Sequence, residues 1–324
     1  MQKSFADLGR VEAIRELFEG SGYEPFREPL WTEAPKGGIL TTAGRVLLEG
    51  VDFDLVYFPL KHLGYKSVVA VTGELYAVCS TPQTLSVVLG VSAKLDFAQI
   101  GELWGGMLAA AREFGYKALS LDLQPSKNGL CISLSASGIE IAPKGRPKAQ
   151  SMDLICVSGR LGAAFLGQQV LERKSSELEK YKMMLAAYLK PELEADLPAR
   201  LEEAGVKPPF GFFVTRGLSD AVLRLSRDSG LGVKVYADKI PFEGNSFALG
   251  KELDIDPVSA AMNGGDDFVV LYVIPSALFE KFSREFKTFE VIGHLARPEV
   301  GAALVSPDGL EHPVSAPGWN INNQ

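Results

Sequence analysis

Short runs of apolar residues alternate along the chain with longer stretches in which apolar residues recur at helical spacing. The short runs, many of them rich in β-branched side chains, predict strands, and the helical spacing predicts helices. The predicted strands are residues 68–72, 85–91, 119–123, 130–136, 153–159, 211–215, 233–237, 268–274 and 289–295. The predicted helices are residues 97–117, 161–171, 175–190 and 219–230. This alternation predicts a mixed α/β fold.

The N-terminal segment predicts one further, amphipathic helix. Within residues 1–20, Val11, Ile14, Leu17 and Phe18 fall on one helical face. The segment lacks the basic start and apolar core of a signal peptide. No apolar run in the chain approaches the roughly 20 residues that span a bilayer. The sequence therefore predicts no membrane partner.

The segment APKGRPKAQ, residues 142–150, interrupts the pattern with turn formers and basic residues. A chain of 324 residues is long enough for two domains at about 150 residues each. We therefore predict a first domain over residues 1–145 and a second over residues 146–324.

Composition narrows the classes of function. The net charge of −7 argues against a nucleic-acid partner, which needs a basic face. The three cysteines lie far apart in apolar segments, which predicts buried thiols in a reducing compartment. The three histidines are equally scattered, so a zinc site or a Ser-His-Asp triad has little to build on. We expect a cytoplasmic protein.

Two segments combine glycine with charge or with a strand-to-helix turn. In LLEGVDFDLVYFP, residues 47–59, Glu49 and Gly50 precede an acidic and aromatic stretch, which a solvated turn after a strand also explains. In SGRLGAAFLG, residues 158–167, a turn between a predicted strand and helix aims backbone N–H groups at anions. Its glycines also simply permit tight packing, so both interpretations stay open.

Two further segments offer ligand-binding side chains. In AMNGGDDFVVLYVI, Asp266 and Asp267 open a predicted buried strand, where paired acids suit Mg²⁺ or a substrate hydroxyl or amine. A solvated turn explains the same pair equally well. Near the C-terminus, Trp319 either covers the edge of a core or stacks on a flat ligand.

Taken together and in order, these segments resemble the thiamine-monophosphate kinases of the aminoimidazole ribonucleotide synthetase superfamily. LLEGVDFDL is similar to the family's D-x-L-V-E-G-V-H-F, and HLGYKSVVAVTGELYAVCSTP is similar to its L-G-y-K-a-i-a-v-N-x-S-D-i-y-A-M-x-a-x-P. DLICVSGRLGAAFLGQQVLER resembles D-l-i-x-V-T-G-x-L-G-x-a-x-x-G-L-x-x-L, and TRGLSDAVLRLSRDSGLG resembles S-D-G-L-s-x-D-L-x-x-i-x-x-x-S-g-v-g. GGDDFVVLYVI resembles G-G-E-D-Y-E-L-L-F. The resemblance runs from about Gly38 to Trp319.

The resemblance implies a two-domain synthetase-like α/β fold, whose N-terminal sheet domain forms a homodimer. It implies ATP-dependent phosphorylation of thiamine monophosphate to thiamine diphosphate, with Mg²⁺ bridging phosphate oxygens. By position, it implies nucleotide contacts by Asp122, Arg146 and Thr215. It implies substrate contacts by Asp52, Asp266 and Trp319, and metal ligation by Glu74 and Asp122. No catalytic residue is assigned.

The departures from the family pattern lie mainly in the acidic metal motifs. Arg45 and Arg216 fall where the family has aspartates, and Phe213 replaces a third acid. An arginine about 4 Å from Mg²⁺ repels it by roughly 8 kcal/mol at an effective dielectric of about 20. We therefore predict an impaired metal site, and Arg45 and Arg216 are candidates for direct contact with phosphate if the chain binds a phosphate ligand without a metal. Three hypotheses follow: a working kinase, a phosphate-ligand binding protein without catalysis, and a structural dimer.

Overall fold

The computed structural model describes residues 5–24, 38–140, 146–173 and 178–315 of the chain. The chain divides into two compact units. The first unit takes in residues Met1–Lys144 together with Leu193–Ala199, and the second takes in Gly145–Glu192 and Arg200–Gln324. The predicted boundary after residue 145 adjoins residues 141–145, which lie outside the described residues, and it stays a prediction.

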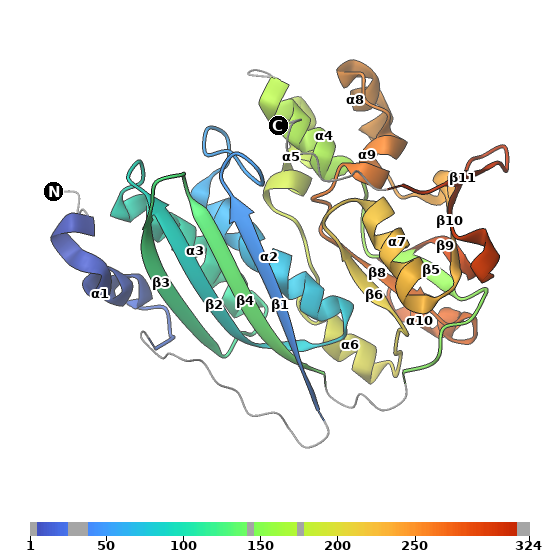
Figure 1. Cartoon of the computed structure of the whole chain (residues 1–324), viewed down its shortest axis with the longest axis horizontal. Coiled ribbons are helices and arrows are strands. Elements are labelled where there is room, and N and C mark those ends of the chain that lie inside the picture. Colours follow the sequence, from blue (N-terminus) through green and yellow to red (C-terminus); the bar gives the residue numbers. More distant parts are fainter. Residues whose placement is uncertain (1–4, 25–37, 141–145, 174–177, 316–324) are drawn as a thin grey trace. The chain divides into compact units, whose positions relative to one another are not determined.

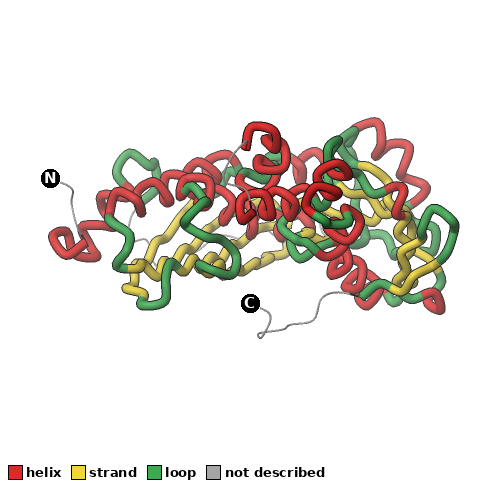
Figure 2. The backbone as a smooth tube through the Cα atoms, turned by 90° about the horizontal axis from the view of Figure 1, so that it is seen from above, coloured by secondary structure: helices red, strands yellow, loops and turns green. Residues whose placement is uncertain are grey.

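The first unit is a sheet covered on one face by helices (Figure 1; Figure 2). The sheet has the strand order β1-β4-β2-β3, in which β2 and β3 are parallel and the other neighbours are antiparallel. Its elements are α1 (Phe5–Phe18), β1 (Ile39–Leu48), α2 (Leu60–Ala77), β2 (Thr81–Ser92), α3 (Phe97–Glu113), β3 (Ala118–Ser126) and β4 (Cys131–Glu140). The predicted strands at 85–91, 119–123 and 130–136 and the helix at 97–117 are confirmed, apart from their ends.

The predicted strand at residues 68–72 is wrong, because this run lies in the middle of α2. The apolar run looks like a strand because α2 is buried on nearly all sides, between the sheet and α3. Two glycines permit this close packing: a Cβ on Gly64 would lie 1.9 Å from the carbonyl oxygen of Leu103, and one on Gly106 would lie 2.0 Å from that of Lys61. Strand β1 was not predicted.

The N-terminal helix α1 packs on α3. Ile14, Leu17 and Phe18 are buried as predicted, and the indole N–H of Trp104 donates to the carbonyl oxygen of Leu17 at 2.9 Å. Val11 was predicted on the same face, but 63% of it is exposed. The apolar face of α1 is therefore narrower than the sequence indicates.

The second unit is built on a sheet with the strand order β11-β10-β7-β9-β5-β8-β6, in which only β10 and β7 are parallel neighbours. Its strands are β5 (Leu154–Val157), β6 (Gly211–Val214), β7 (Gly232–Tyr236), β8 (Val269–Ile274), β9 (Glu290–Ala296), β10 (Ala302–Val305) and β11 (Glu311–Pro313). The α-helices of this half of the chain are α4 (Ala163–Arg173), α5 (Lys182–Leu189), α6 (Leu197–Glu203), α7 (Leu218–Ser229), α8 (Ser246–Leu253), α9 (Pro257–Asn263) and α10 (Phe279–Glu285). Short 3₁₀ turns are η1 (Leu178–Tyr181), η2 (Ala237–Lys239), η3 (Ser276–Leu278) and η4 (Pro298–Val300).

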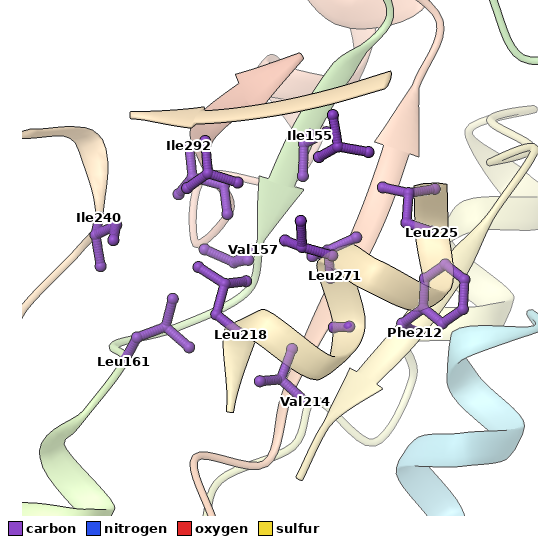
Figure 3. Close-up of a cluster of buried hydrophobic side chains, with 14 of the residues drawn as sticks. Ile155, Val157, Leu161, Phe212, Val214, Leu218, Leu225, Ile240, Leu271 and Ile292 are labelled. Atoms are coloured by element: carbon purple, nitrogen blue, oxygen red, sulfur yellow. The ribbon is translucent and has the colours of Figure 1, made fainter. Parts of the chain in front are cut away.

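One face of this sheet packs against α7 and α9 in a core of buried aliphatic residues (Figure 3). On the other face, Phe282 and Phe286 of α10 stack on each other and meet the ring of Phe289 edge-to-face, and Phe289 stacks on Tyr272 of β8. The five strands predicted in this half of the chain and the helices at 161–171 and 219–230 are confirmed. The helix predicted at 175–190 is divided into η1 and α5 over its described part, and α6, α8, α9, α10, β10 and β11 were not predicted.

The thiols are free, and only Cys156 is fully buried. Burial raises the pKa of Cys156 to about 12, so this thiol stays protonated at neutral pH. Cys79 and Cys131 are half-buried, so the prediction of buried thiols is wrong for these two. None of the helices that the structure describes has the length and hydropathy of a membrane-spanning segment.

Candidate functional site

Three glycine-containing loops meet at one end of the seven-stranded sheet. Strands β5 and β6 both pair with β8 in antiparallel fashion, with Val157 opposite Leu271 and Val214 opposite Val269. The carboxyl ends of β5 and β6 therefore lie beside the start of β8. The loops at this end are residues 158–162, 215–217 and 263–268, which we call the loop cluster.

Backbone hydrogen bonds join these loops. Ser158 donates its N–H to the carbonyl oxygen of Val270 at 3.0 Å, and its hydroxyl accepts the N–H of Val270 at 2.9 Å. On the other side of β8, Asp266 donates its N–H to Thr215 at 3.0 Å, and Phe268 donates to Val214 at 2.9 Å. Backbone hydrogen bonds therefore hold the first loop to β8 and join the other two loops to each other.

The backbone of the loop cluster is strained. Gly265, Asp266 and Phe268 have φ angles of 81°, 61° and 52°, although a bulky residue such as phenylalanine rarely adopts positive φ. Phe268 is held there by burial and by an edge-to-face contact with Phe213 at 5.6 Å. Residues held in such conformations cluster at binding and catalytic sites, so the strain singles out these loops as the candidate site.

A shared core lies beneath the loops. Leu161 lies in the first loop and Leu218 follows the second, and both are fully buried in one cluster with Val157 and Val214 (Figure 3). Helices α4 and α7 begin immediately after these two loops, and Gly217 precedes α7 with φ at 85°. Their first backbone N–H groups lack intrahelical acceptors, which makes this end of the sheet favourable for anions.

The charged side chains of the loop cluster are of both signs. Arg216 is exposed and has no ion-pair partner among the described residues. The guanidinium of Arg160 donates to a carboxylate oxygen of Glu290 at 2.7 Å. Asp266 is half-buried, whereas Asp267 is buried with both carboxylate oxygens shielded from solvent. Only one carboxylate of the paired acids is therefore available to a ligand at the surface.

Of the predicted site residues, the structure brings Thr215, Arg216 and Asp266 together in the loop cluster. The buried Thr215 accepts the Asp266 N–H, and a Cβ on Gly265 would lie 3.5 Å from the Cα of Arg216. Arg146 is half-buried in the segment that precedes β5. Trp319 lies outside the described residues.

Four further predicted site residues, Arg45, Asp52, Glu74 and Asp122, belong to the first unit. Asp52 accepts the backbone N–H of Leu48 at 2.8 Å and donates its own N–H to the carbonyl oxygen of Leu48 at 2.9 Å. Its neighbour Glu49 accepts the N–H of Leu130 at 2.6 Å, which ties the turn to the end of β4. Both carboxylates therefore hold a turn together.

Arg45 and Asp122 lie on opposite faces of the first unit's sheet. Asp122 shares a face with its register partner Val88, and this face continues through the partners of β4 to Val46 on β1. Arg45 precedes Val46 and so points to the other face, which α2 covers. Glu74 is on α2. The structure therefore does not bring Glu74 and Asp122 together, and each remains a separate prediction.

The donor set of the loop cluster does not fit a magnesium ion held by several carboxylates. Mg²⁺ needs hard oxygen ligands in octahedral geometry. The loops offer one half-buried carboxylate, Asp266, with the arginine Arg216 on the adjoining loop. Among the described residues, no group of three His, Cys, Asp or Glu side chains comes together as a metal site.

The Arg160–Glu290 pair was not predicted. Arg160 lies in the SGRLG turn that the sequence identifies as suited to anions, so the position of the turn was visible but the role of its arginine was not. Glu290 begins β9, and its approach to Arg160 follows from the pairing of Val157 with Glu290 in the sheet. Pairing between strands that are far apart in the sequence gives no local signal.

Comparison with known proteins finds thiamine-monophosphate kinases among the relatives of this chain. The chain is 22% identical over 314 residues to the thiamine-monophosphate kinase of Aquifex aeolicus, covering 96% of this chain and 99% of the kinase. It is 24% identical over 228 residues to the thiamine-monophosphate kinase of Rhodopirellula baltica, covering 70% of this chain and 66% of that protein. No family model matches the chain.

Solved structures show the same fold. AaThiL complexed with AMPPCP and TMP superposes with a TM-score of 0.73 at 21% identity, covering 84% of each chain. The hydrogenase maturation protein HypE in complex with ATP superposes with a TM-score of 0.68 at 17% identity, covering 97% of this chain and 94% of HypE. The fold is thus the synthetase-like fold that the motifs imply, and in sequence the chain is similar over most of its length to curated thiamine-monophosphate kinases.

Proposed function

We propose that this chain binds ATP and thiamine monophosphate, that the loop cluster contacts their phosphate groups, and that phosphoryl transfer between them is slow or lost. The observation that carries this proposal is Arg216, which is exposed on a loop that adjoins the strained loop of Asp266 and Phe268. A guanidinium presents a planar set of donors that matches phosphate oxygens and brings positive charge without a metal.

The relatives support the choice of ligands. The Aquifex enzyme is a thiamine-monophosphate kinase, AaThiL was solved with AMPPCP and TMP, and HypE was solved with ATP. A protein of this fold and family is therefore a reasonable host for a nucleotide and a thiamine phosphate. Of the residues implied by the family, Thr215 and Asp266 accompany Arg216 in the loop cluster, and we propose Arg146 and Trp319 as further ligand contacts.

The chemistry of phosphoryl transfer supports the proposal that transfer is slow or lost in this chain. Phosphoryl transfer depends on positioning and on neutralising charge at the β- and γ-phosphates, a role that Mg²⁺ fills in most kinases. An arginine neutralises one negative charge, but it does not bridge two phosphate groups as a divalent ion does. An arginine at a position of a metal ligand therefore favours binding over catalysis.

Calorimetry and turnover together test the proposal. We expect ATP and thiamine monophosphate to bind the full chain in buffer with EDTA, with affinities that change little on adding Mg²⁺. We expect formation of thiamine diphosphate from both substrates with Mg²⁺ to be far below that of the Aquifex kinase assayed in parallel. Binding that requires Mg²⁺, together with turnover similar to that kinase, would show instead that the chain is a working enzyme.

A separate observation favours self-association of the first unit. Leu40, Val46 and Leu48 of β1 and Val88 of β2 lie on the sheet face opposite α2, and they are 39–51% exposed. We propose that this face forms a homodimer, since apolar side chains gathered on one sheet face are typical of an interface. Sedimentation velocity is expected to give a dimer for the unaltered chain and a monomer for Val46→Lys. A monomer in both cases would exclude this interface.

A further inference from the structure

We infer that Arg160 is a second phosphate-contacting residue of the loop cluster, and that Glu290 holds its guanidinium until a ligand phosphate displaces the carboxylate. This inference rests on the proposed function and extends it to a residue that the family pattern does not mark. It also makes Glu290 a competitor of the ligand, which gives the pair an experimental signature of its own.

The position of Arg160 relative to Arg216 follows from the sheet. Arg160 lies three residues after Val157, the last residue of β5, and Arg216 lies two residues after Val214, the last residue of β6. Since β8 separates β5 from β6, two strand spacings of about 4.8 Å each separate their ends. With the strand ends about 10 Å apart, the long side chains of the arginines on the loops that follow can both reach a phosphate group lying over the start of β8.

The loops themselves fix the two starting points. Leu161 donates its N–H to the carbonyl oxygen of Pro241 at 2.9 Å and is fully buried, so the backbone next to Arg160 is anchored. On the other loop, a Cβ on Gly217 would lie 2.5 Å from the carbonyl oxygen of Met262, so the backbone next to Arg216 is tightly packed. The backbone next to each arginine is therefore held in place, while the two side chains are exposed to solvent.

The ion pair between Arg160 and Glu290 is suited to exchange. Its two side chains are each 49% exposed, and exposed pairs of this kind contribute little net stability. A phosphate carries up to two negative charges and accepts a bidentate guanidinium, so it competes well with a single carboxylate. The ligand feature recognised here is therefore a phosphate group with at least one unesterified face.

A purely structural pair is the opposing interpretation. In that case Arg160 would serve only to join the loop after β5 to the start of β9, and removing either charge would change stability without changing affinity. The two interpretations differ most in the effect of neutralising Glu290. A competitor, once neutralised, strengthens ligand binding, whereas a structural partner does not.

Calorimetry with ATP and with thiamine monophosphate, in EDTA and low salt, tests the inference on full-length variants. We expect Arg160→Gln to weaken binding about tenfold. We expect Glu290→Gln to strengthen it roughly two- to fivefold, since it releases an exposed ion pair. The matched control is Arg227→Gln, because Arg227 also pairs with a neighbouring carboxylate, Asp228, but lies in the last turn of α7, away from the loop cluster.

The outcomes distinguish failure of the inference about Arg160 and Glu290 from failure of the proposed function. If the unaltered chain binds ligand and both Arg160→Gln and Glu290→Gln bind as it does, the inference is overturned and the proposed function stands. If the unaltered chain binds neither ligand, the proposed function fails and the inference fails with it. Thermal unfolding of each variant shows that a change in affinity does not come from loss of the fold.

Discussion

The acidic turn of the first unit and the loop cluster of the second use their charged side chains in opposite ways. In the turn, the carboxylates of Glu49 and Asp52 accept backbone N–H groups and so hold the chain in place. In the loop cluster, backbone groups bond to one another, as Asp266 does with Thr215. The backbone hydrogen bonds that join the loops of the loop cluster therefore do not involve its arginine side chains.

This difference bears on two residues that stand in opposite relation to the family pattern. Asp52 falls in a family motif, but its carboxylate is already engaged by the backbone of its own turn. Arg216 departs from the same family's pattern, but it lies exposed where loops converge. The arrangement around a residue, more than its identity, decides whether it can meet a ligand.

The largest effect is expected where α2 and α3 of the first unit pack closely against each other. Gly106→Ala places a Cβ about 2.0 Å from the backbone oxygen of Lys61, so α2 and α3 must separate. We expect a loss of about 3 kcal/mol in the free energy of unfolding, measured by chemical denaturation. The neighbouring Gly105 has no atom within 4 Å of its Cβ position, and Gly105→Ala is expected to stabilise the helix by about 0.5–1 kcal/mol. Equal effects at the two positions would contradict the close helix packing.

The next largest effect is expected in the loop cluster. Gly217→Ala combines φ at 85° with a Cβ 2.5 Å from the carbonyl oxygen of Met262, so we expect a loss of about 2–3 kcal/mol in unfolding free energy. Because Arg216 is adjacent, ligand affinity by calorimetry is also expected to fall. Gly230 at the end of α7 has φ at 67° but open space, and Gly230→Ala should cost about 1 kcal/mol and leave affinity unchanged. Unchanged affinity in Gly217→Ala would separate the loop cluster from ligand binding.

Much of the fold could be predicted from local pattern. The strands at 85–91 and 268–274 stand out because their apolar runs are short and bounded by turn residues. Residues 68–72 were misassigned because a helix buried on both sides loses the helical periodicity that marks an amphipathic one. Strand β1 was missed because it is an edge strand with exposed and polar positions, held by its pairing with β4.

The candidate site, too, could be predicted only in part from the sequence. Thr215, Arg216 and Asp266 could be found because each lies in a glycine-containing turn next to a predicted strand. The approach of Arg160 to Glu290 depends on the pairing of β5 with β9, which are more than a hundred residues apart. The separation of Arg45 from Asp122 depends on strand register, which a one-residue shift would reverse.

A smaller effect, confined to stability, is expected at the acidic turn. Glu49→Ala removes the acceptor of the Leu130 N–H, and Leu130 is buried, so we expect a loss of about 2 kcal/mol in unfolding free energy. Ligand affinity by calorimetry is expected to stay the same. The matched control is Asp54→Ala, because Asp54 accepts the N–H of the exposed Val56 at 2.8 Å and water can replace it there. A fall in affinity in Glu49→Ala would mean that the turn also contacts ligand.

The smallest effect is expected at Asp266, where its sign distinguishes an anion site from a metal site. Asp266→Asn removes a negative charge beside Arg216 and suits the backbone, because asparagine readily adopts the positive φ found there. If a phosphate binds at the loop cluster without a metal, the lost repulsion strengthens ATP binding in EDTA by about 0.5–1 kcal/mol, since one unit charge near the surface has an effect of this order. If Asp266 ligates Mg²⁺, the same variant weakens Mg²⁺-dependent binding instead. Calorimetry with and without Mg²⁺ measures both, and Asp254→Asn is the matched control because Asp254 also has positive φ, at 57°, but ends α8 away from the loop cluster.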